Sequence, residues 1–87
     1  MKKKFIILEN IEEEGAECII VESESAPKAL FNYLDELFNL NDPWMSDEDI
    51  CNNMLRNEFF AVAPINKVGP VDFQYYNSID EIKKEIK

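Results

Sequence analysis

Residues 5–21, FIILENIEEEGAECIIV, contain two short apolar runs separated by a polar, acidic segment. The runs at 5–8 and 18–21 are rich in β-branched residues, and the segment between them contains one glycine. This pattern predicts a β-hairpin with a rather long acidic loop. Because both runs place apolar residues at consecutive positions, we expect the strands to lie in a sheet that is covered on at least one face.

A helical pattern follows the hairpin. Ser25 is a candidate for the N-cap, and Pro27 lies in the first turn, where its missing amide donor costs little. Apolar residues then recur at helical spacing and define the expected core face of this helix. They are Leu30, Tyr33, Leu34, Leu37 and Phe38.

The stretch 41–55, NDPWMSDEDICNNML, predicts the start of a second helix. Ser46 is the expected N-cap, and Asp49 has the spacing of its capping-box partner. Met45 and Ile50 have the spacing of a hydrophobic staple. The expected apolar face of the helix starts with Ile50 and continues through Cys51, Met54 and Leu55, and Asn57 is expected to end the helix.

Two further strands are predicted at 58–63 and 71–76, and the second alternates with Val71, Phe73 and Tyr75 inward. Ser78 and Glu81 have the spacing of a capping box that begins a short last helix. The expected fold is therefore α+β in ββααββα order. A mainly antiparallel four-stranded sheet would pack with two central helices and the short C-terminal helix, in one domain that spans residues 1–87.

The net charge of −9 is unevenly distributed along the chain. Residues 5–66 contain fourteen acidic residues, whereas Lys28 and Arg56 are the only basic residues there. Nucleic-acid and anionic-membrane binding both require clustered lysine and arginine, so we expect neither. A basic protein is the natural electrostatic complement.

Localisation is inferred from the N-terminus and the cysteines. We expect no secretory signal, because only residues 5–8 form an apolar run after the initial lysines. Cys18 and Cys51 form no CxxC pair, and both are expected to be buried free thiols. A reducing cytoplasm fits this cysteine use better than a disulfide scaffold does.

The residues that support most catalytic chemistry are missing. The chain has no histidine, and its two glycines stand alone, so it contains neither a histidine-based triad nor a glycine-rich phosphate loop. The acidic stretch 41–49 lacks the glycine and the terminal glutamate of a calcium loop, and Pro43 interrupts it. A metal-dependent nuclease built on Asp72, Glu81 and Lys83 would lack a basic substrate-binding surface. We therefore expect a protein that is not an enzyme and needs no metal or cofactor.

The leading hypothesis is an inhibitor or adaptor that occupies a basic, nucleic-acid-binding surface of another protein. In size and charge alone, the chain resembles the small DNA mimics of phages and mobile elements, which include anti-CRISPR and anti-restriction proteins. Nine side chains are the expected partner-binding residues. They are Glu12, Glu13, Glu14, Asp35, Glu36, Asp42, Trp44, Asp47 and Glu48.

The alternative hypothesis is a homo-oligomeric structural or regulatory subunit, most simply a homodimer. It would associate through a strand edge or through an apolar surface formed by Phe31, Phe38 and Trp44. Trp44 has no part in the expected helix start, so it either fills the core or stands out as an interface anchor. We favour the core position, because tryptophan is highly buried on average.

Overall fold

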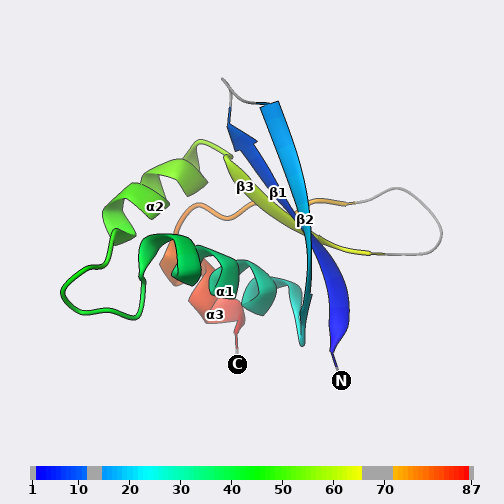
Figure 1. Ribbon diagram of the computed structural model, residues 1–87, viewed down its shortest axis with the longest axis horizontal. Helices are drawn as coiled ribbons and strands as arrows, with labels where there is room; N and C mark the ends of the chain where they lie inside the picture. Colours follow the sequence, from blue (N-terminus) through cyan, green and yellow to red (C-terminus); the bar gives the residue numbers. More distant parts are fainter. Residues whose placement is uncertain (1, 12–14, 66–71, 87) are drawn as a thin grey trace.

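A computed structural model describes residues 2–11, 15–65 and 72–86 of the chain (Figure 1). It confirms an α+β fold, with a three-stranded antiparallel sheet and three helices in those residues. Along the chain the elements are β1 (Lys3–Ile11), β2 (Gly15–Ser23), α1 (Ala26–Phe38), α2 (Glu48–Arg56), β3 (Phe60–Pro64) and α3 (Ile79–Glu85). The sheet is therefore one strand smaller than the predicted four-stranded sheet.

The predicted hairpin is confirmed as β1 and β2. The two strands pair antiparallel from Lys3 opposite Ser23 to Ile11 opposite Gly15. β3 pairs antiparallel with the other side of β1, so the sheet order is β2-β1-β3 and β1 is the central strand. The strands extend beyond the apolar runs because pairing continues through the polar residues that flank them.

The predicted strand at 71–76 contributes one isolated bridge, in which Gln74 lies antiparallel to Val62. Val71 lies outside the described residues. Tyr76 is buried and Tyr75 is exposed, so the predicted inward position of Tyr75 is wrong. The chain leaves the sheet after Gln74 and begins α3 at Ile79, which brings Tyr76 rather than Tyr75 into the core.

The core lies between the helices and one face of the sheet. Side chains alternate across a strand, so Phe5 and Ile7 point to one face of β1 and are buried against α1. The three helices lie together on one side of the strands in Figure 1. The remaining fully buried large side chains include Leu30, Leu34, Cys51, Leu55, Phe60, Val62, Ile79 and Ile82.

Two predicted burial positions are wrong for the same geometric reason. Leu37 is exposed although it has helical spacing, because α1 presents Ala29, Leu30 and Leu34 to the sheet. Cys18 is exposed because it lies opposite Leu8, on the sheet face that points away from Phe5 and Ile7. Cys51 is buried as predicted.

Three of the four residues that the sequence predicts as helix caps are confirmed. Ser25 Oγ accepts a hydrogen bond from the Lys28 amide at 3.3 Å, and Ser78 Oγ accepts one from the Glu81 amide at 3.2 Å. Asn57 ends α2 as predicted. Within the described ranges, no helix is both long enough and apolar enough to cross a bilayer.

Candidate protein-binding site

The loop that connects α1 to α2 extends away from the sheet (Figure 1). Asn39 ends α1 in the left-handed conformation, with φ 54°, and its amide donates to the Asp35 carbonyl oxygen at 2.8 Å. At the other end of the loop, the Asp47 amide donates to the Phe38 carbonyl oxygen at 2.9 Å. These two bonds fix both ends of the loop to the last turn of α1.

Two predicted site residues, Asp35 and Asp42, form hydrogen bonds within this loop. Asp35 accepts from the backbone amide of Asn41 at 3.0 Å and from its side-chain amide at 2.8 Å. Asp42 Oδ1 accepts from the amides of Trp44 at 2.8 Å and Met45 at 3.1 Å, which is an Asx turn. Both carboxylates therefore shape the loop, and neutralising Asp35 would disturb the loop as well as its charge.

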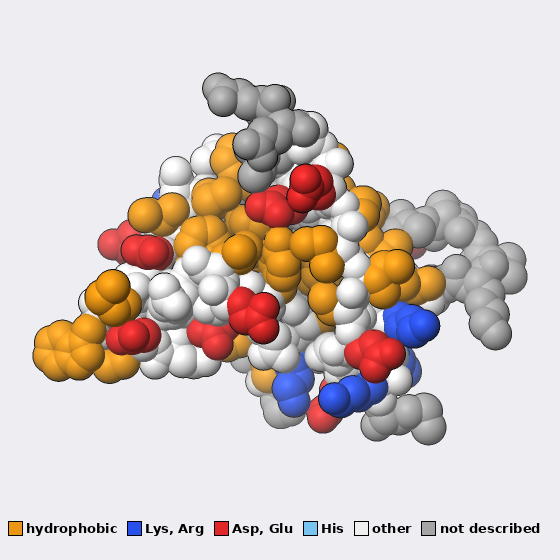
Figure 2. Space-filling view, in the orientation of Figure 1, with side chains coloured by type: hydrophobic (Ala, Val, Ile, Leu, Met, Phe, Trp, Pro, Cys, Tyr) orange, Lys and Arg blue, Asp and Glu red, His pale blue; other side chains and the backbone are white. Residues whose placement is uncertain are grey.

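Trp44 is 90% exposed, so the prediction that it fills the core is wrong. The Asx turn of Asp42 explains the difference, because it bends the chain at Trp44, in the α1–α2 loop that extends away from the sheet (Figure 1). Met45 and Ile50 are also exposed, and because the N-cap of α2 is Asp47, they do not occupy the two positions of the predicted hydrophobic staple. Figure 2 shows hydrophobic side chains at the far left, over this loop, with acidic side chains nearby.

The second helix begins one residue later than predicted. Its N-cap is Asp47, and no side chain forms a capping hydrogen bond there. Because Ser46 is not the N-cap, its predicted capping box with Asp49 is wrong. Glu48 and Asp49 occupy the first turn, where the helix dipole favours negative charge without any direct capping bond.

We define the acidic tip as residues 41–50, which comprise most of the α1–α2 connection and the first turn of α2. Asp47, Glu48 and Asp49 are all exposed there. Among the residues that the structure describes, the one ion pair joins Lys28 to Glu24 at 3.5 Å. No described lysine or arginine therefore neutralises the carboxylates of the acidic tip by direct pairing.

The structure brings four of the nine predicted site residues together in the acidic tip, namely Asp42, Trp44, Asp47 and Glu48. Asp35 joins them through its bonds to Asn41. Glu36 lies outside the acidic tip and lines a cavity between α1 and β2.

Glu12, Glu13 and Glu14 lie outside the described residues. Sequence reasoning missed Met45 and Ile50 as surface residues, because their spacing was assigned to a staple. The proline of Asn41-Asp42-Pro43 was the available signal that the chain turns before the helix.

The aromatic residues of the alternative interface occupy different environments. Phe38 is partly buried, and its ring packs edge-on against Phe60 with 6.1 Å between the ring centroids. Phe31 packs against the core, and Lys83 Nζ lies 5.7 Å from the centre of its ring. Of the three residues in that hypothesis, Trp44 alone is fully available to a partner.

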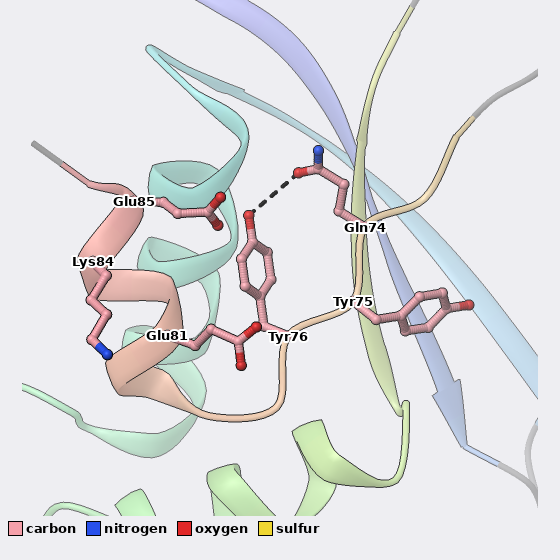
Figure 3. A pocket seen from close by; sticks show the side chains of 6 residues that line it. All are labelled: Gln74, Tyr75, Tyr76, Glu81, Lys84 and Glu85. Carbon is pink, nitrogen blue, oxygen red and sulfur yellow. Dashed lines mark hydrogen bonds between the residues drawn. The ribbon is translucent and has the colours of Figure 1, made fainter.

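A second surface feature is an open cavity of about 500 Å³ beside α3 (Figure 3). Tyr76 points into it, and its hydroxyl donates to Gln74 Oε1 at 3.3 Å. Burial raises the pKa of Tyr76, and the nearby carboxylates of Glu85 and Glu81 raise it further. This tyrosine therefore stays neutral and does not act as a base near neutral pH.

The other perturbed groups are also held in their neutral forms. Burial raises the pKa of the Cys51 thiol to about 12, and the charge of Glu48 adds to the effect. Burial raises the pKa of Tyr33 to about 12, and the hydrogen bond that its hydroxyl donates to Glu9 adds to the shift. A nucleophile or general base needs the opposite shift, so none of these groups is activated for catalysis.

Within residues 2–11, 15–65 and 72–86, no three cysteine, aspartate or glutamate side chains lie close enough together to hold a metal ion. In the acidic tip, Asp47, Glu48 and Asp49 are exposed, and the Asp42 carboxylate bonds to the amides of its own turn. In chemical terms the tip is a charged surface with an exposed aromatic ring.

Comparisons with known proteins give no further guide to this surface. Neither the models of protein families, nor the curated proteins, nor the solved structures include a significant match to the chain.

Proposed function

We propose that this protein is a non-enzymatic inhibitor or adaptor that binds a basic partner protein through the acidic tip. The observation that carries the proposal is Trp44, which is 90% exposed on a loop whose backbone is fixed by Asp35 and Asp42. A fixed, exposed tryptophan resembles an interface hot spot, because it offers a large contact area and loses little conformational freedom on binding.

The charge around Trp44 indicates what kind of surface it meets. Asp47, Glu48 and Asp49 follow Trp44 closely in the chain and present exposed carboxylates. A partner that matches them has an apolar pocket bordered by lysine and arginine. The nucleic-acid-binding grooves of proteins provide such basic surfaces, and inhibition would follow from excluding the nucleic acid.

The experiment starts with affinity capture from the native host, and mass spectrometry identifies the partner. The purified partner is then titrated with the wild-type protein and with Trp44→Ala. Trp44 is exposed, so its removal should change the free energy of unfolding by no more than about 0.5 kcal/mol. Binding should weaken by about 30-fold or more, which corresponds to about 2 kcal/mol for a hot-spot tryptophan. Tyr75→Ala removes another exposed aromatic and is the matched control.

The charge contribution is tested by neutralising Asp47 and Glu48 together, since neither side chain forms a described hydrogen bond. The control is a double variant that removes the same charge elsewhere, Asp72→Asn with Asp80→Asn, because both residues are exposed. The Debye length, over which charges interact, shortens from about 30 Å at 0.01 M salt to about 10 Å at 0.1 M. Binding should therefore weaken over that range of salt concentration. Salt-insensitive binding that the Asp47 and Glu48 changes leave intact would contradict the proposal. Competition with nucleic acid for the partner tests the inhibitory role.

A further inference from the structure

The outer edge of β2 is a surface that lies outside the acidic tip. β2 lies at one end of the sheet order β2-β1-β3 and is nine residues long. A long strand at a sheet edge presents unpaired backbone groups that can bond to another strand. Soluble proteins commonly shorten, bulge or cover such edges.

The backbone groups that face outward follow from the register. Val62 and Gln74 exchange both of their backbone hydrogen bonds, at 3.1 and 2.8 Å, so Val62 directs its groups away from β1. Its partner on β1 is Ile7, which must therefore direct its own groups to β2 and to Ile19. Alternation then places the outward backbone groups of β2 at its even-numbered residues. They are Ala16, Cys18, Ile20 and Glu22.

The side chains of these four residues lie on the sheet face opposite the helices. Ile20 is 65% exposed there, and Cys18 is exposed beside it. Their partners on β1 are Ile6 and Leu8, which are partly exposed on the same face. A strand added to this edge would therefore place alternate side chains beside an apolar surface.

The other side of the same edge is acidic. A cavity of about 260 Å³ lies between β2 and α1, and its lining includes Val21, Asn32 and Glu36. Glu17 is exposed, and its charge contributes to the raised pKa of Tyr33 in the same cavity. An added strand would place its other side chains beside these carboxylates.

We propose that the β2 edge accepts an antiparallel strand from a basic partner protein, with lysine or arginine alternating with apolar residues. The apolar residues would lie beside Cys18 and Ile20, and the basic residues beside Glu17 and Glu36. This is recognition by strand addition, in which backbone bonds give affinity and alternate side chains give specificity. The inference rests on the proposed function only in assuming a basic partner.

The probe is a capped seven-residue peptide, Lys-Val-Lys-Ile-Lys-Val-Lys, and the assay is amide hydrogen exchange followed by NMR. In the free protein, the amides of Cys18 and Ile20 should exchange faster than those of Ile19 and Val21, which are bonded to β1. With peptide at ten times its Kd, exchange at Cys18 and Ile20 should slow by about tenfold, because only the unbound fraction exchanges. The odd-numbered amides should change little.

Two control peptides separate backbone pairing from charge. N-methylation of the valine and isoleucine residues removes the donors that would face β2, and should abolish binding. Replacement of lysine by glutamate should also abolish it. Equal binding by either control peptide would overturn the inference, as would peptide binding that fails to protect Cys18 and Ile20.

Variants of the protein complete the test. Cys18→Pro removes one outward donor while the bonds to β1 remain, and proline is tolerated at such edge positions. It should weaken peptide binding at least tenfold, and Ile20→Lys, which repels the basic peptide, gives the same test if the proline variant does not fold. Trp44→Ala should bind the peptide normally, so failure of the acidic tip and failure of the edge are distinguishable. Concentration-dependent protection of Cys18 and Ile20 without peptide would assign the edge to a second copy of this chain and overturn the proposal.

Discussion

Three serines near helix starts provide a matched test of the local structure. Ser78 Oγ caps α3 by accepting from the Glu81 amide at 3.2 Å, and Ser25 Oγ caps α1 by accepting from the Lys28 amide at 3.3 Å. Ser46 precedes α2, whose N-cap is Asp47 and has no side-chain capping bond. Alanine at Ser78 or Ser25 should therefore lower the free energy of unfolding by about 1 kcal/mol. Alanine at Ser46 should change it by no more than about 0.5 kcal/mol.

Urea denaturation followed by circular dichroism measures all three variants. For a chain of this size an m-value of about 1–2 kcal/mol per M converts the loss of a cap into a midpoint shift of roughly 0.5–1 M. Thermal melting should show a corresponding fall of roughly 4–8 °C. If Ser46→Ala destabilises the protein as much as Ser78→Ala does, α2 starts at Ser46 and the geometry of the acidic tip described above is wrong.

Three further predictions concern the thiols, the response to alkali and the need for metal. Cys18 is exposed, whereas Cys51 is buried and the pKa of its thiol is raised to about 12. A thiol reagent should therefore modify Cys18 rapidly in the folded chain and Cys51 only on unfolding. Mass spectrometry of the modified peptides identifies which cysteine has reacted. The folded state holds the pKa of Tyr33 at about 12 against an ordinary value of 10.0, so its stabilising contribution is complete below pH 10 and is lost as the pH rises from 10 towards 12. Tyr33→Phe should make that loss smaller in melts across this range, and an unchanged profile would contradict the assignment. Melting curves with and without a chelator should coincide, and a large drop with chelator would reveal a metal site.

Several local features of this protein could be predicted from the sequence alone. The apolar runs on either side of the acidic segment gave the hairpin, and Ser25, Asn57 and Ser78 marked helix ends correctly. Each of these signals depends on residues within a few positions of one another, so the chain specifies them before any tertiary contact forms. The acidic character of residues 5–66 is likewise a property of the sequence, and it defines the class of partner that we propose.

Only the tertiary structure decided which side chains of these elements face solvent. Cys18 and Cys51 both belong to apolar patterns that predict burial, but α1 packs on the sheet face that Cys18 does not share. The pairing of β3 with the far side of β1 left β2 at the edge of the sheet that the described residues form, which the hairpin pattern alone could not specify. The hydrophobicity of Trp44 predicts burial, and that prediction is wrong because the hydrogen bonds of Asp35 and Asp42 fix its loop away from the core. Burial depends on which surfaces meet when distant segments pack, and that information is not contained in any short stretch of the chain.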